Sequence, residues 1–152
     1  MPREATRQPP PVAVLIDVIR ASTTIVTLLD RGAPEVVLVG QRDGARLGEL
    51  RGELGALVCA EDASGQKAAE ADLPPSPAAL EGLDLAGRRV ILATTNGTLA
   101  AELVHDCGVE HVLIGSMRNG AAVMRSTVAL ARRSRRRRGR GSGTARARRR
   151  PG

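Results

Sequence analysis

Short apolar runs alternate with helix-like segments along most of the chain, and this alternation limits the folds available to it. Runs rich in Val, Ile and Leu are typical of strands covered on both faces. The segments between them carry apolar residues at helical spacing, and several end at a glycine. This β-α-β order with short connections predicts a mainly parallel sheet with right-handed crossovers. The expected strands are residues 12–16, 35–39, 56–60, 90–93 and 109–114, and the expected helices are residues 21–30, 43–54, 99–106 and 121–132.

The composition divides the 152 residues into three parts. Residues 1–11 are polar and proline-rich, and we expect a flexible segment there. Residues 12–131 form the predicted domain, a three-layer α/β/α fold with enough residues for a core. Residues 132–152 carry eleven of the 23 basic residues and no acid, Leu, Ile or Val, so we expect a disordered arginine-rich tail. The remaining 12 basic and 16 acidic residues give an acidic body, so the net charge of +7 comes from the tail.

Several classes of protein are excluded or disfavoured by the composition. No run approaches the roughly 18 apolar residues of a membrane helix, and the first residues contain no apolar signal core, so we expect a cytoplasmic protein. Cys59 and Cys107 lack CxxC spacing, and we predict two buried thiols in a reducing compartment. The absence of Phe, Trp and Tyr disfavours a site that stacks single-stranded bases. No GxGxxG, P-loop or GxSxG motif is present.

Polar residues follow three of the expected strands. The carboxyl ends of parallel strands meet at one edge of an open sheet, where ligands usually bind. Backbone N–H groups at helix starts, hydroxyls and Arg side chains together suit a phosphate or sulfonate. The residues are Asp17, Arg20, Ser22, Thr23 and Thr24 in the first turn, Thr94, Thr95, Asn96, Gly97 and Thr98 in the second, and Ser116, Arg118 and Asn119 in the third.

A divalent cation fits the same edge. Asp17 stands directly after an apolar run, and Glu61 or Asp72 from the long polar segment 61–87 would supply a further carboxylate. Such oxygen ligands suit Mg²⁺, which would assist phosphoryl chemistry. Two simpler interpretations stay open. Ser, Thr and Asn before a helix are commonly N-caps worth about 1 kcal/mol each. Glu61 and Asp72 lie in a polar loop, and the sequence pattern alone favours solvated residues there.

Three segments occur in the same order as the motifs of a known family. DVIRASTTIV (residues 17–26), ATTNGT (93–98) and GSMRNGAAV (115–123) resemble the DVLRATTTI, TTTNGT and G-S-x-x-N motifs of the 2-phosphosulfolactate phosphatase family. The resemblance covers about residues 12–131. It implies an α/β phosphatase that uses Mg²⁺ to hydrolyse 2-phosphosulfolactate to sulfolactate and phosphate, a step toward coenzyme M in methanogens.

The resemblance also implies roles for particular residues. It makes Asp17 and Arg20 catalytic and makes Asp17, Glu61 and Asp72 the metal ligands. The implied substrate-binding residues are Thr23, Thr24, Thr95, Asn96, Gly97, Thr98, Ser116 and Asn119. One departure is Asp62, which stands where the family has Arg, and an acid there would weaken phosphate binding.

The C-terminal part of the chain departs further from the family. Members continue with more α/β structure, so we expect that part of the fold to be missing, with the arginine-rich tail arising from a shifted reading frame. The apolar surface left uncovered would favour a homo-oligomer. Two alternatives to a phosphatase stay open: a non-catalytic anion-binding remnant, and a non-specific nucleic-acid binder that uses the tail through counterion release.

Overall fold

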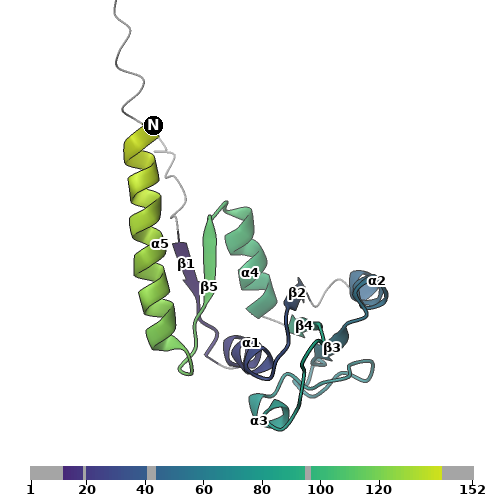
Figure 1. The fold of residues 1–152 in the computed structure, drawn as a ribbon. Coiled ribbons are helices and arrows are strands. Elements are labelled where there is room, and N and C mark those ends of the chain that lie inside the picture. The colour runs from purple at the N-terminus through teal and green to yellow at the C-terminus, as the bar shows by residue number, and fades with distance from the viewer. Residues whose placement is uncertain (1–11, 19, 41–43, 95–96, 142–152) are drawn as a thin grey trace, which may run out of the picture.

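The computed structural model describes residues 12–18, 20–40, 44–94 and 97–141 (Figure 1). The predicted flexible segment 1–11 and the end of the predicted tail, residues 142–152, lie outside these residues. The strands are β1 (Val12–Leu15), β2 (Val36–Gly40), β3 (Leu57–Ala60), β4 (Val90–Thr94) and β5 (His111–Ile114). The helices are α1 (Ala21–Asp30), α2 (Gly44–Leu54), α3 (Pro77–Leu80), α4 (Gly97–Asp106) and α5 (Gly120–Gly141).

All strand pairs are parallel, which confirms the α/β class and the predicted pairing direction. The strands nevertheless form two sheets instead of the single sheet expected. β1 pairs with β5, and β4 lies between β2 and β3 in a separate sheet. Helix α4 lies between the two sheets in Figure 1 and contacts strands of both. Helix α1 also contacts strands of both sheets, so these two helices connect the sheets by packing.

The larger sheet is covered by helices on both faces. Successive residues of a strand point to opposite faces. Val90 and Leu92 of β4 accordingly pack with Leu28 of α1 and Leu80 of α3, whereas Ile91 packs on the opposite side against α2. This gives the three-layer α/β/α arrangement that the apolar runs predicted. The core is aliphatic throughout, as the absence of aromatic residues requires.

The last helix differs most from its prediction. We expected it to end near Arg132, but α5 continues to Gly141, so the first part of the predicted disordered tail is helical. The physical reason is that arginine is a good helix former, and a run of arginines offers no residue that breaks a helix before Gly139. Among the described helices, none combines the length and the apolar character needed to cross a bilayer.

A short helix also interrupts the long polar segment. α3 begins at Pro77, whose fixed φ and missing N–H suit the first position of a helix. Leu80 is completely buried in the core, and nearby Pro75 is buried as well. Sequence reasoning missed this helix because four residues carry no detectable helical period.

Candidate functional site

The turn between β1 and α1 positions Asp17 at the end of its strand. The backbone N–H of Asp17 donates a hydrogen bond of 2.8 Å to the hydroxyl of Ser22, which lies buried in the first turn of α1. This hydroxyl also lies 3.5 Å from the carbonyl oxygen of Leu15. Ser22 therefore fastens the start of the helix to the end of the strand. Within the described part of the chain, no side chain pairs with the Asp17 carboxylate.

Arg20 has an unusual backbone conformation directly before α1. Its φ is 109°, and it is the sole non-glycine residue with positive φ among the described residues. Such a conformation costs on the order of 1–3 kcal/mol and occurs often at functional sites. The Arg20 carbonyl oxygen accepts a hydrogen bond of 2.7 Å from the N–H of Thr24, so the strained residue still starts the helix.

The Arg20 guanidinium crosses to the carboxyl end of β3. Its Nη2 lies 2.5 Å from Glu61 Oε2, and its Nη1 donates a 3.0 Å hydrogen bond to the carbonyl oxygen of Gly65. The Glu61 carboxylate is largely buried, whereas the Arg20 side chain keeps 38% of its surface exposed. The first turn and the segment after β3 are thus joined at one point, with Arg20 accessible from solvent. We call this group, consisting of Arg20, Glu61 and Gly65, the Arg20 clamp.

The loop that presents Gly65 is organised by Asp62. One Asp62 oxygen accepts hydrogen bonds from the Ser64 hydroxyl (2.6 Å), the Ser64 N–H (2.8 Å) and the Gln66 N–H (3.0 Å). The Ser64 hydroxyl and the Gln66 N–H hold the pKa of the Asp62 carboxyl below its usual value. Asp62, the acid that departs from the family motif, is therefore engaged in hydrogen bonds within its own loop.

Gly65 is the residue of the clamp that sequence reasoning missed. Its φ is +80°, and a Cβ placed there would lie 3.0 Å from Arg20 Nη2. Only glycine gives both this conformation and this close approach without strain. The segment from Asp62 to Gln66 carries the Asp, Ser and Gly pattern of a tight turn, which was the available signal.

Of the two threonines expected to bind substrate in the first turn, Thr24 has another role. It is completely buried, and its hydroxyl donates a hydrogen bond of 3.2 Å to the carbonyl oxygen of Pro75. Thr24 therefore holds the long polar segment against α1. Thr23 is half-buried and is the better placed of the two for a ligand.

The second predicted turn is described only in part. Thr95 and Asn96 lie outside the described residues, and Gly97 and Thr98 are described only as the start of α4. Their predicted contacts with substrate stay predictions.

In the third predicted turn, Ser116 and Asn119 bond to one another and to the neighbouring backbone. Asn119 Oδ1 accepts a hydrogen bond of 2.8 Å from the Ser116 N–H, and Asn119 Nδ2 donates one of 3.0 Å to the Ile114 carbonyl oxygen. Arg118 pairs with Glu81 and with Asp30, the last residue of α1. The ends of α1 lie roughly 15 Å apart at 1.5 Å per residue. The structure therefore shows Ser116 and Asn119 shaping the start of α5, with no bond to the Arg20 clamp in the described part of the chain.

Asp72 is also not brought to the clamp. Its carboxylate pairs with Arg51 at 2.9 Å and accepts a hydrogen bond of 2.8 Å from the Val58 N–H. Val58 lies near the start of β3, whereas Glu61 follows its end, and at about 3.3 Å per residue this separates them by roughly 10 Å. Asp72 is thus a structural residue that holds the polar segment to α2 and β3.

Asp17 and Glu61 remain as candidate ligands for Mg²⁺. Among the described residues, no group of three or more His, Cys, Asp and Glu side chains is arranged to hold a metal. Mg²⁺ often uses one or two carboxylates with waters and substrate phosphate completing its shell. Asp17, whose carboxylate has no described partner, fits this smaller requirement, whereas Glu61 is already neutralised by Arg20.

The two cysteines differ in environment, which corrects the prediction of two buried thiols. Cys59 is buried in β3, whereas Cys107 is exposed in the turn after α4. Burial, together with the nearby charge of Glu61, raises the pKa of the Cys59 thiol to about 12. The Cys59 thiol stays protonated near neutral pH and is not a nucleophile of this site.

Alkylation with a maleimide near neutral pH is therefore expected to modify Cys107 alone in the folded protein, because Cys59 is both buried and protonated. Mass spectrometry after alkylation should show one label per native chain and two after denaturation. Rapid labelling of Cys59 in the native protein would contradict the packing of β3.

Comparison with known proteins adds a separate line of evidence. Residues 1–134 match the family described as 2-phosphosulpholactate phosphatase. The probable 2-phosphosulfolactate phosphatase of Deinococcus radiodurans is 38% identical over 122 residues, which cover 80% of this chain and 50% of the relative. The correspondingly named protein of Thermus thermophilus is 34% identical over 122 residues, covering 80% and 49%. That of Thermotoga petrophila is 38% identical over 112 residues, covering 74% and 46%.

The chain spans about half the length of the curated relatives it matches. The matched part includes both sheets, the Arg20 clamp and the start of α5. The extent of the match over this chain and the agreement among relatives lead to one conclusion: the chain belongs to the 2-phosphosulpholactate phosphatase family.

Proposed function

We propose that this chain forms part of a phosphatase site that uses Mg²⁺ to hydrolyse 2-phosphosulfolactate, or a related small acidic phosphoester, to the alcohol and phosphate. Family membership and the names of the relatives support this reaction. The structural observation that carries the proposal is the Arg20 clamp, which fixes an exposed guanidinium in the same turn as an acid without a described partner, Asp17.

Arg20 would bind the anionic groups of the substrate. A guanidinium has five N–H groups in a planar fork, and the bonds to Glu61 and Gly65 use only two of them. No other described residue bonds to the remaining N–H groups, which suit a bidentate contact with phosphate or sulfonate oxygens. Because the clamp fixes the guanidinium before substrate arrives, little side-chain freedom is lost on binding. Thr23 would add a hydroxyl from the same turn.

Asp17 would hold Mg²⁺ together with the substrate phosphate, and Glu61 would be a further ligand only if it released Arg20. Bound there, Mg²⁺ would neutralise phosphate charge and orient the phosphoester. The role that we assign to Glu61 is to position Arg20, because its carboxylate lies 2.5 Å from the guanidinium. We also place this function in the cytoplasm, where free thiols such as Cys59 and Cys107 stay reduced.

The decisive experiment compares Asp17→Asn with Asp84→Asn. Asp84 is a control because, among the described residues, its carboxylate accepts a single hydrogen bond, from the Ala86 N–H within its own exposed loop. Phosphate release from 2-phosphosulfolactate with Mg²⁺ should fall at least about a hundredfold in Asp17→Asn and stay unchanged in Asp84→Asn. Equal phosphate release by the wild type and Asp17→Asn would exclude Asp17 from the reaction.

Thermal melts followed by circular dichroism complete this test. A ligand at about 100 times its dissociation constant should add roughly 2.7 kcal/mol to the free energy of unfolding. We expect stabilisation of the wild type by Mg²⁺ and 2-phosphosulfolactate together. Stabilisation without any release of phosphate would instead identify a non-catalytic anion-binding domain.

A further inference from the structure

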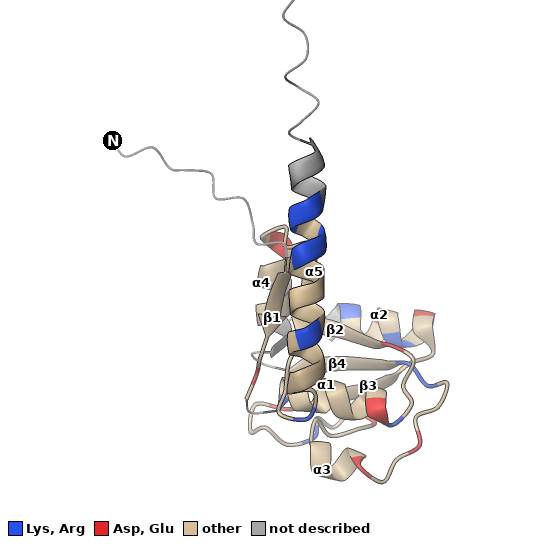
Figure 2. Cartoon of the chain, turned by 60° about the vertical axis from the view of Figure 1, so that its left-hand side comes forward, with Lys and Arg blue, Asp and Glu red and all other residues tan. Residues whose placement is uncertain are grey.

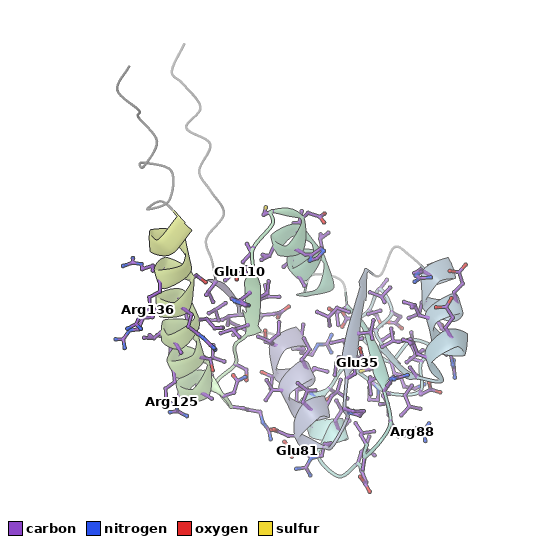
Figure 3. The ribbon with its side chains drawn as sticks, turned by 45° about the horizontal axis from the view of Figure 1, so that its top comes forward. Glu35, Glu81, Arg88, Glu110, Arg125 and Arg136 are labelled. Carbon is purple, nitrogen blue, oxygen red and sulfur yellow. The ribbon has the colours of Figure 1, made fainter. Side chains whose placement is uncertain are left out.

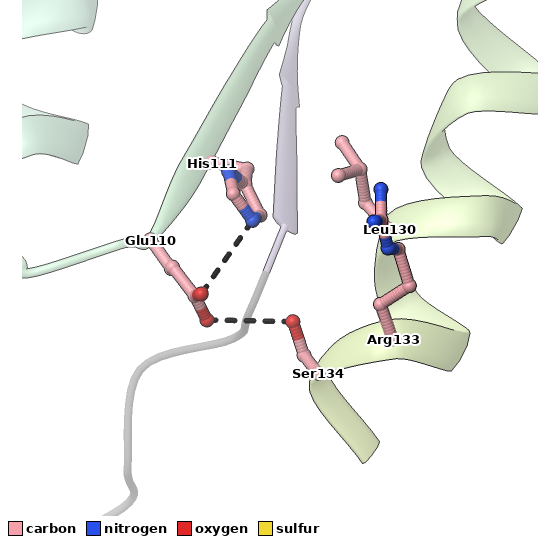
Figure 4. A pocket seen from close by; sticks show the side chains of 5 residues that line it. All are labelled: Glu110, His111, Leu130, Arg133 and Ser134. Carbon is pink, nitrogen blue, oxygen red and sulfur yellow. Dashed lines mark hydrogen bonds and ion pairs between the residues drawn. The ribbon is translucent and has the colours of Figure 1, made fainter. Parts of the chain in front are cut away.

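Among the described residues, one side of helix α5 contacts the rest of the chain. It packs along β1 and β5 (Figure 1), with Val123 and Ser134 buried on the contact side. The Ser134 hydroxyl donates a hydrogen bond of 3.3 Å to Glu110, which also pairs with His111 at 3.5 Å (Figure 4). These contacts fix the rotation of α5 about its own axis, so they decide which of its residues face outward.

The outward side carries a row of arginines. Arg125, Arg132 and Arg136 are exposed, and their separations of seven and four residues put them on one line along a helix. At 1.5 Å per residue, the steps along this line are about 10 Å and about 6 Å. Arg133 and Arg135 are exposed on either side of the line. Figure 3 shows Arg125 and Arg136 pointing away from the strands. We call these five residues the arginine face.

The arginine face lacks counter-charges, whereas most described arginines of the body have one. Arg20, Arg51, Arg89 and Arg118 each pair with a carboxylate of the body. In the described part of the chain, by contrast, no residue of the arginine face forms an ion pair. α5 itself contains no Asp or Glu. Figure 2 shows the outer part of α5 marked by basic residues alone, while acidic and basic residues mix on the body.

We propose that the arginine face binds the phosphodiester backbone of duplex nucleic acid without sequence preference. A duplex carries one negative charge per about 1.7 Å of its axis, so a row of about 16 Å faces several phosphates at once. Arginine forks suit phosphate oxygens. α5 contains no Asn or Gln to read base edges, and the chain contains no aromatic residue to stack on single-stranded bases.

An anionic membrane fits the same helix less well. A helix that lies on a bilayer buries a free apolar side among the lipids. In α5 the apolar side packs against β1 and β5. Two large apolar residues of α5, Met124 and Val128, are exposed beside Arg125 and Arg132. They form a smaller apolar side than a membrane-bound helix buries. The chemistry of the outward side is therefore that of a phosphate-binding surface.

The test measures binding of the full chain to a fluorescent random-sequence DNA duplex of about 20 base pairs, by anisotropy at several NaCl concentrations. A plot of log K against log salt has a negative slope, and its magnitude should fall by about 3 in the triple variant Arg125→Gln/Arg132→Gln/Arg136→Gln. Each lost phosphate contact removes about 1 from this magnitude. Glutamine keeps the helix propensity of arginine, and circular dichroism checks that α5 is retained.

A matched pair of single variants distinguishes binding by the arginine face from an effect of net charge. Arg125→Gln and Arg88→Gln remove the same charge from exposed positions in different parts of the molecule (Figure 3). Arg125→Gln should reduce the magnitude of the slope by about 1, and Arg88→Gln should leave it unchanged. Equal effects of the two variants, or an unchanged slope in the triple variant, would overturn the proposal. So would binding to phosphatidylserine vesicles that depends on the arginine face while duplex binding does not.

Discussion

Replacing Leu28 with alanine is expected to lower the free energy of unfolding by about 2–5 kcal/mol. Leu28 is 0% exposed and lies on the side of α1 that faces the larger sheet. It belongs to the cluster that also contains Leu80, Val90 and Leu92. Truncating the side chain would leave a cavity among close-packed aliphatic neighbours, which cannot fully collapse into the space.

The neighbouring residue provides the control for this prediction. Leu29 is 47% exposed, so Leu29→Ala should change the free energy of unfolding by no more than about 0.5 kcal/mol. Both substitutions make the same change in helix propensity, so the difference between their effects on the free energy of unfolding isolates the contribution of burial. Urea denaturation followed by circular dichroism measures both. Similar midpoints for Leu28→Ala and Leu29→Ala would show that α1 does not dock on the sheet as described.

The loss of stability expected for Leu28→Ala is large for a domain of this size. Natural domains are stable by only about 5–15 kcal/mol in total. Because Arg20 directly precedes α1, a helix that detaches from the sheet also moves the guanidinium away from Glu61. The core residue and the candidate site are therefore coupled through the position of α1.

Much of the fold could be predicted from the sequence because local patterns determine it. α1 begins and ends where its apolar spacing and the following glycine predicted. The apolar runs gave all five strands to within one or two residues. The division into two sheets could not be predicted, because strand order is a long-range property. The predicted end of α5 was wrong, because we gave the lack of Leu, Ile and Val in the tail more weight than the helix propensity of arginine.

The candidate site was predictable in part for a similar reason. Asp17 and Arg20 were identified because polar residues after an apolar strand mark the carboxyl edge of a sheet. Glu61 was predicted as a metal ligand, and the structure shows it paired with Arg20. Asp72 could not be separated from Glu61 by sequence, because the partner that occupies it, Arg51, lies on a different element.

Gly65→Ala is expected to weaken binding of 2-phosphosulfolactate by about tenfold to a hundredfold, the range for a small misplacement of a binding group. The added Cβ would lie 3.0 Å from Arg20 Nη2, so the end of the Arg20 side chain must shift. The hydrogen bonds to Glu61 and to the Gly65 carbonyl oxygen would both be disturbed. The dissociation constant follows from the ligand-dependent rise of the melting midpoint.

Gly55→Ala separates this effect from backbone strain. Gly55 also has a positive φ, of 58°, but a Cβ there would meet no atom within 4 Å. Both alanine variants should lose roughly 1–2 kcal/mol of stability from the left-handed backbone. Only Gly65→Ala should also lose affinity, because only there does the Cβ contact Arg20. If the two variants bound 2-phosphosulfolactate equally well, the position of Arg20 would not control substrate binding, and the role proposed for the Arg20 clamp would be wrong.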